Sequence, residues 1–351
     1  MELSALQTSL LCLLIVAVLV LPLTVHKVEE NLEAFLFVCG TIAVTVSHVW
    51  SGHLIGAALT EPIKITLAVL IAGLLFKRFA RAIQSGTQTA VLKLGFKCTL
   101  AAIVFILGLT SSLITAIIAA LVLAEIVPLL PLDRKGRVRL VVYSCYAIGM
   151  GAVLTSIGEP LGTIVLAKLR GAPHFAGFWF LVDHLGWYVL GGVIAMAILS
   201  IRIPLVANNT SADETAGDPS AHSISGIIIR AAKVYAFVMA LVLLGDGLKP
   251  LAEMTITKLS SDALYFINTL SAILDNATLA AIEITPDITL RNLVFLLISL
   301  IIAGGMLIPG NIPNIICASK LKITSKEWAK VALPVGAGLL VVYFAILHIV
   351  L

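Results

Sequence analysis

Charged residues are scarce in this chain. Lys and Arg together number 23 and Asp and Glu 19, so that 12% of the 351 residues are charged while 60% are apolar. Soluble domains average about 25% charged residues, and one membrane-spanning helix needs about 20 mostly apolar residues. The chain therefore holds apolar sequence for roughly eight to ten spans. This composition excludes soluble enzymes and nucleic-acid-binding proteins, and it predicts a lipid bilayer as the first partner.

Motifs for metals, nucleotides and redox chemistry are also missing. The five cysteines lie singly in apolar stretches, without the paired spacing of a zinc site. Gly149 and Gly151 lack the third glycine of a dinucleotide site, and no phosphate-binding loop of the ATPase type occurs. We therefore predict no cofactor, and no ATP-driven step by this chain.

Several long apolar runs are interrupted near their centres. The runs 98–130, 138–169, 262–286 and 290–321 are too long for one level span or contain Gly, Pro and polar residues midway. Irregular backbone at membrane depth is tolerated only where it is buried in protein or lines a cavity. The interruptions are therefore the places to look for a site.

Basic residues cluster in the segments 77–97, 131–139 and 320–330. Because cytoplasmic loops of membrane proteins are enriched in Lys and Arg, we expect all three on the cytoplasmic side. The run 98–130 must then enter and leave on that side as a re-entrant hairpin, with two full spans as the open alternative. By the same reasoning 262–286 is a hairpin from the opposite side.

The order of these segments predicts an all-α polytopic membrane protein with an inverted repeat, two re-entrant hairpins, two broken helices and about eight full spans. The expected parts are 1–60, two N-terminal transmembrane helices; 61–203, the first repeat, with hairpin 98–130 and broken helix 138–169; 204–224, a polar cytoplasmic linker; and 225–351, the second repeat, with hairpin 262–286 and broken helix 290–321. We expect a multi-pass protein of the prokaryotic cytoplasmic (inner) membrane, with both termini extracytoplasmic.

Two carboxylates lie at the interruptions. Glu159 stands in the first broken run and Asp275 at the tip of the second hairpin. A carboxylate at membrane depth costs about 2.5–3.5 kcal/mol on insertion scales, so it needs a cation, a proton or a basic partner. We predict that both bind the transported ion, with Na⁺ as the expected metal. The structural alternative is that Glu159 is a neutral acid that braces its break and that Asp275 only caps the next helix.

Neutral oxygen donors surround these acids, as a hard cation requires. Those predicted to line the site are Asn276, Asn311, Asn314, Ser111, Ser112, Thr115, Ser156, Thr163, Ser271 and Thr278. The predicted helix-breaking residues are Gly158, Pro160, Gly310 and Pro313. Glu125 and Glu283, late in their hairpins, are interpreted as solvated acids near the membrane faces.

Two short motifs resemble a known group of transporters. Ile157-Gly158-Glu159-Pro160 and Leu274-Asp275-Asn276-Ala277 resemble those of the ion transporter superfamily, most of all the D-type sodium/proton antiporters and an uncharacterised family of prokaryotic cation transporters. The resemblance implies that Glu159 replaces the first ion-binding carboxylate, an aspartate in the antiporters, and that Asp275-Asn276 matches the second. The first tip, Thr110 to Thr115, has no Asp-Asn pair, and the Ser-Asn-Thr tips of dicarboxylate carriers are absent.

These observations predict a secondary active cation transporter, a Na⁺/H⁺ antiporter in which a monovalent cation and a proton compete for Glu159 and Asp275. The alternative is a Na⁺- or H⁺-coupled carrier of an anion or a small neutral solute. An intramembrane aspartyl protease needs two acids on facing helices, so we expect no enzyme. Glycine clusters at 304–305 and 336–338 are compatible with a homodimer face.

Overall fold

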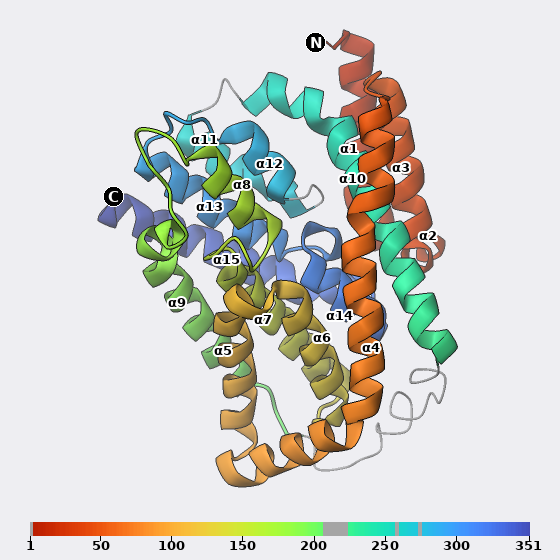
Figure 1. Cartoon of the computed structure of the whole chain (residues 1–351), viewed down its shortest axis with the longest axis vertical. Coiled ribbons are helices and arrows are strands. Elements are labelled where there is room, and N and C mark those ends of the chain that lie inside the picture. Colours follow the sequence, from red (N-terminus) through yellow and green to blue (C-terminus); the bar gives the residue numbers. More distant parts are fainter. Residues whose placement is uncertain (1–2, 206–223, 257–259, 273–275) are drawn as a thin grey trace.

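The computed structural model describes residues 3–205, 224–256, 260–272 and 276–351, and these contain helices and no strand (Figure 1). Within those ranges six helices are long and apolar enough to cross a membrane. They lie in α1 (Ala5–Thr24), α4 (Gly52–Leu94), α5 (Phe96–Ile114), α9 (Phe180–Ile201), α10 (Ile224–Ile256) and α15 (Ser325–Val350). The chain is thus an all-helical multi-pass protein, as its composition predicts.

The other helices are shorter. They are α2 (His26–Glu30), α3 (Leu32–Val46), α6 (Ala116–Ile126), η1 (Val127–Leu129), α7 (Arg134–Ala152), α8 (Pro160–Lys168), α11 (Ser261–Ile267), η4 (Asn268–Ala272), α12 (Asn276–Glu283), α13 (Leu290–Gly304), η5 (Ile308–Gly310) and α14 (Ile312–Leu321).

The helices α1, α3, α4 and α10 lie together along one side of the molecule (Figure 1). Glycines let α3 and α10 approach closely, since a Cβ on Gly40 would lie 2.9 Å from Leu243 Cβ. In the same contact the Ser47 hydroxyl donates to the Gly247 carbonyl at 2.6 Å. The apolar helix α10 therefore packs against α3 in one specific position.

One prediction about this side needs correction. The boundary expected at residue 61 falls inside α4, which also includes most of the basic segment 77–97. Ala, Leu, Lys, Arg and Gln dominate that segment and are good helix formers, so the helix continues through it. It ends only at Gly95, whose φ of +79° lies in a region that glycine adopts without strain.

Two helices are broken in the same way. Residues 153–159 separate α7 from α8, and residues 305–311 separate α13 from α14. The residue before each second helix is extended, with φ −157° and ψ 163° at Glu159 and φ −154° and ψ 146° at Asn311. Each second helix has proline in its first turn, where the missing N–H costs nothing.

The second break therefore begins earlier than the Gly310 to Asn314 stretch that the sequence indicates. The helix α13 already ends at Gly304, and Pro313 and Asn314 belong to α14. The proline starts the second helix rather than ending the first.

The first hairpin consists of α5 and α6. The chain reverses at Thr115, whose φ is +75°, within the predicted tip. The second hairpin consists of α11 with η4 and of α12, and its tip residues 273–275 lie outside the described ranges.

The hairpins and the broken helices of the two halves pair crosswise: α6 packs beside α14, and α8 packs beside α12 (Figure 1). Along the first pair, Cys317 Sγ lies 3.4 Å from the Ala120 carbonyl oxygen, and Lys320 meets Glu125 at the far end. At the end of the second pair, the Lys168 ammonium donates to the carbonyls of Ala281 and of Ile284. In both pairs the two helices run in the same direction.

The basic segments 131–139 and 320–330 share one face of the molecule. Arg134 donates to the Leu321 carbonyl at 2.9 Å and to the Lys322 carbonyl at 2.6 Å, and it pairs with Glu327 at 2.7 Å. The guanidinium thus caps the C-terminal end of α14, where unpaired carbonyls favour a cation. The charge pattern predicts that these two segments lie on the same side of the membrane, and their shared face agrees with that prediction.

Candidate functional site

The N-terminal ends of α6 and α8 meet. The Ala116 N–H, at the start of α6, donates to the Gly158 carbonyl at 2.9 Å. Close by, the Thr155 hydroxyl donates to the Ser112 carbonyl at 2.5 Å. The first hairpin tip is therefore fixed to the first break through backbone groups that neither helix can satisfy internally.

The ends of α12 and α14 meet at Gly304. The Asn314 amide donates to the carbonyls of Gly304 at 2.8 Å and Leu307 at 2.9 Å. On the same glycine, a Cβ would lie 2.5 Å from the Asn276 amide nitrogen. The two asparagines at the starts of α12 and α14 thus contact one residue.

The two halves join through α7. The Ser111 hydroxyl donates to the Ile148 carbonyl at 2.9 Å, and a Cβ on the next residue, Gly149, would lie 2.9 Å from the Asn311 amide nitrogen. With the crosswise pairing, these contacts bring the N-terminal ends of α6, α8, α12 and α14 to one region.

Glu159 is the carboxylate that the structure places in this region. It is half-buried at the N-cap of α8, and its Oε1 atom is shielded from solvent. Gly158 and Gly162 hold it there, because a Cβ on either would collide with the backbone of residues 152–155. Asp275, the second predicted carboxylate, lies outside the described residues, directly before Asn276.

The second-half amides are deeply buried. Asn276 is 4% exposed and Asn314 0%. Their Oδ1 atoms have no hydrogen-bond partner among the described residues. An unpaired buried carbonyl-type oxygen is costly, so both atoms are available to a cation.

The first-half hydroxyls brace the helix ends. Ser111 and Ser112 donate to backbone carbonyls within α5, and Thr163 donates to the Ser156 carbonyl at 2.9 Å. The Thr115 side chain accepts from the Ile118 N–H at 3.3 Å and caps α6. The hydroxyl hydrogens of Ser111, Ser112 and Thr163 are therefore bonded to backbone carbonyls, and only the lone pairs of their oxygens remain to bind an ion.

The remaining second-half residues pack against the break or the long helices. Ser271 donates to the Leu300 carbonyl at 3.3 Å, and Thr278 lies against Gly245 of α10. A Cβ on Gly310 would lie 3.0 Å from the Ala272 backbone, so this glycine lets Ala272, the last residue of η4, contact the second break.

Within the two breaks, positive charge comes from the helix ends. Residues 153–159 and 305–311 contain no Lys or Arg. Each helix N-terminus carries about +0.5 elementary charge and unpaired N–H groups. The region can therefore hold carboxylates in their charged form and surround a cation with neutral and acidic oxygens.

The structure corrects the interpretation of two acids. Glu125 is not a solvated acid, because Lys320 pairs with it and the two side chains are only 14% and 16% exposed. Glu283 is not solvated either, because its Oε2 accepts from the Asn268 amide at 3.1 Å. Lys168 and Lys320 were missed, although they follow Glu159 and Asn311 at the same spacing, a signal that aligning the two breaks would have found.

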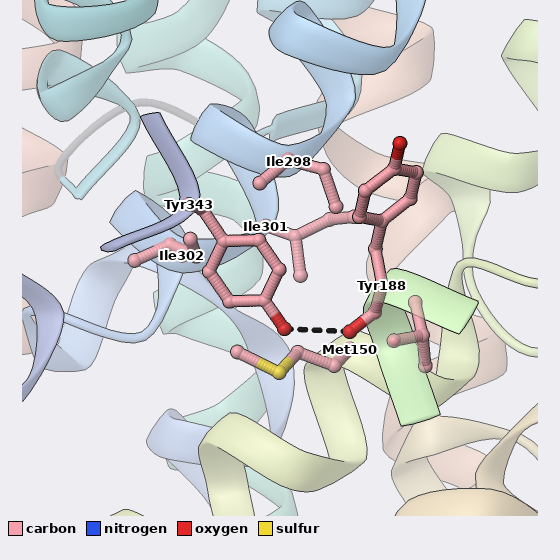
Figure 2. A pocket seen from close by; sticks show the side chains of 7 residues that line it. Met150, Tyr188, Ile298, Ile301, Ile302 and Tyr343 are labelled. Atoms are coloured by element: carbon pink, nitrogen blue, oxygen red, sulfur yellow. Dashed lines mark hydrogen bonds between the residues drawn. The ribbon is translucent and has the colours of Figure 1, made fainter. Parts of the chain in front are cut away.

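A small pocket lies beside the site, between α7, α9, α13 and α15 (Figure 2). The Tyr343 hydroxyl donates to the Tyr188 carbonyl at its edge, at 2.5 Å. Its lining residues are Met150, Tyr188, Val189, Ile298, Ile301, Ile302 and Tyr343. Such an apolar wall gives a cation no ligands, so the pocket is not the ion site.

Residues 8–350 match a family described as "Protein of unknown function (DUF1646)", and the chain belongs to that family. No curated protein matches it.

Proposed function

We propose that this protein is a secondary active cation transporter, which exchanges Na⁺ for H⁺ across a prokaryotic cytoplasmic membrane without a cofactor. The observation that carries the proposal is the set of oxygen ligands at the helix breaks, namely the half-buried Glu159 carboxylate at the start of α8 and the Oδ1 atoms of Asn276 and Asn314, which have no hydrogen-bond partner among the described residues. Secondary transporters place ion sites at such half-helix ends. A half-buried acid together with buried amide oxygens from the neighbouring helix starts is a ligand set for a small hard cation.

The crosswise pairing supports an inverted repeat. The hairpin arm α6 of the first half pairs with α14 of the second, and α12 of the second pairs with α8 of the first. A pseudo-twofold axis in the membrane plane relates halves in this manner. On this reading the hairpins are re-entrant, and the two halves enter the membrane from opposite sides.

Exchange follows from competition for the acids. Glu159, with Asp275, binds either a proton or Na⁺, and the ion in excess on each side occupies the site. The amides of Asn276 and Asn314 contribute ligands to Na⁺ alone, because a protonated carboxyl needs no coordination shell. Occupancy by either ion then permits the hairpins and broken helices to change their access to the two sides.

The alternative is a Na⁺- or H⁺-coupled carrier of an anion or a small neutral solute. The four helix N-termini favour it, since together they offer about two positive charges. Glu159 brings a negative charge to this region, and the sequence places a second acid, Asp275, directly before Asn276, so we expect this attraction to be offset. We therefore rank cation exchange first.

The test is cation-driven proton movement in vesicles containing the purified protein and an internal pH dye. We expect Na⁺ to move protons, and Li⁺, K⁺ and Ca²⁺ added in turn to define selectivity. Asp287→Asn, which changes an exposed acid outside the site, should behave as the native protein. A folded protein that moves protons with none of these cations would contradict antiport and direct the test to anions and neutral solutes.

Gly304→Ala tests the role of Asn276. The added methyl group would press on the end of the Asn276 side chain, not on backbone, so we expect the fold to persist while Na⁺ binds about tenfold more weakly, a change of about 1.4 kcal/mol. The measurement is the Na⁺ dependence of the melting temperature. Gly338→Ala is the matched control, because a Cβ there meets no atom within 4 Å. Unchanged Na⁺ dependence in Gly304→Ala would remove Asn276 from the site.

A further inference from the structure

Glu283 is a half-buried acid outside the central site. It ends α12, and its carboxylate accepts one hydrogen bond, from the Asn268 amide. The second amide N–H of Asn268 goes to the Ser299 hydroxyl oxygen at 3.0 Å. Among the described residues, Glu283 Oε1 and Asn268 Oδ1 are shielded from solvent and have no donor. One proton on the carboxyl would supply a donor that this cluster lacks.

The corresponding end of the first hairpin is built differently. There Lys320 pairs with Glu125 and satisfies its charge. Lys168 holds the equivalent position at the end of α8, yet it donates to the carbonyls of Ala281 and Ile284 and not to Glu283. An acid paired with lysine stays charged, whereas an acid held by an amide alone is free to exchange a proton.

No charged group compensates Glu283 within the described residues. Among the described side chains, the elements packed against α12 carry Lys168 on α8, Lys233, Asp246, Lys249 and Glu253 on α10, and Arg291 on α13. None of them forms an ion pair with it, and Arg291 instead lies over the Phe295 ring. The exposed Asp287 and His174, which contacts the Ile288 carbonyl, lie in the loops nearby.

A row of buried polar contacts along α13 connects Glu283 with the central site. Asn268 bonds to Ser299, Ser271 bonds to the carbonyl of the next residue, Leu300, and Asn276 contacts Gly304 one turn further on. The other residues of α13 between 293 and 303 are apolar and buried. Amide and hydroxyl side chains aligned in this way inside an apolar bundle offer hydrogen-bonding groups to water, which can carry a proton between two acids.

We propose that Glu283 is a second proton-binding site, which exchanges protons between the Glu283 end of α12 and the central site through water that hydrogen-bonds along the polar row of Asn268, Ser299 and Ser271. The direction of transport through this relay rests on the proposed function. Proton binding at Glu283 does not, so the two are tested separately.

Dicyclohexylcarbodiimide, a hydrophobic reagent that adds to protonated carboxyl groups, tests proton binding directly. The full-length protein is treated in lipid nanodiscs over a range of pH, and modified peptides are located by mass. We expect modification of Glu283 at acidic and neutral pH that declines at alkaline pH, and none of Glu125, which is paired with Lys320. Modification of Glu283 no greater than that of the exposed Asp287 at every pH would overturn the proposal.

Transport tests the relay. Glu283→Gln keeps an acceptor for Asn268, so the fold should persist, but we expect cation-driven proton movement to fall by more than about tenfold while exchange of labelled Na⁺ for Na⁺ continues. Asp287→Asn is the control for loss of a nearby acid. Native proton movement in Glu283→Gln would overturn the relay. If the native protein moves no protons with any cation, antiport fails while the carbodiimide result still decides whether Glu283 binds a proton.

Discussion

Glu159→Gln is expected to abolish cation-driven proton movement and to leave the protein folded. Glutamine has the shape of glutamate but neither binds an exchangeable proton nor carries the charge that holds a cation, so we expect a loss of more than about 100-fold. The fold should change little, because the Glu159 side chain makes no capping hydrogen bond to α8. An uncapped N-terminal position contributes no more than about 1 kcal/mol.

The measurement is the initial rate of the internal pH signal after Na⁺ addition, with the melting temperature recorded for the same preparations. Glu159→Asp, which keeps an ionisable carboxyl on a side chain one methylene shorter, should recover part of the rate. A native rate in Glu159→Gln would place the exchange elsewhere. Loss of rate accompanied by a large fall in melting temperature would assign Glu159 the role of a structural brace.

Lys320→Met is expected to destabilise the protein by about 3–5 kcal/mol, because it leaves the charge of Glu125 buried and uncompensated. Both side chains are largely shielded, at 16% and 14% exposure. The pair lies at the end of the α6 and α14 contact, so its loss should separate the first hairpin from the second broken helix. Thermal or denaturant unfolding in detergent micelles measures the change.

The double variant Lys320→Met/Glu125→Leu is the decisive comparison. Replacement of a buried ion pair by apolar groups is often neutral, so we expect the double variant to recover most of the lost stability. Lys168→Met is the matched single change, and it should cost less because it leaves two carbonyls, not a carboxylate, without a donor. A double variant as unstable as Lys320→Met would show that packing, and not charge, holds this contact.

The helix interruptions were predictable because they depend on local rules. Gly158 and Pro160 cannot continue an ordinary helix, and the structure breaks at that place. Thr115 reverses the first hairpin within the predicted tip. The predicted second break lies too far along the sequence, because a proline can either end one helix or begin the next, and Pro313 begins α14.

Contacts between distant segments were not predictable in this way. The Glu125 and Lys320 pair joins residues 195 positions apart, and Asn268 reaches Glu283 and Ser299 only after α11, η4 and α13 have packed. Hydropathy alone therefore assigned both acids to solvent. The helix α4 is a different case, because the good helix formers of its basic segment were visible in the sequence and only its charge suggested a loop.

The crosswise pairing has a consequence for how the chain is made. The helix α6 is complete at Ile126, but its partner α14 begins only at Ile312. During synthesis the first hairpin enters the membrane without α14, the helix that it will pack against. Likewise α8, in the first broken helix, is made before its partner α12 in the second hairpin, although the interval is shorter. Neither half can acquire its final structure before the other, so folding of the central region is completed only after translation has passed α14.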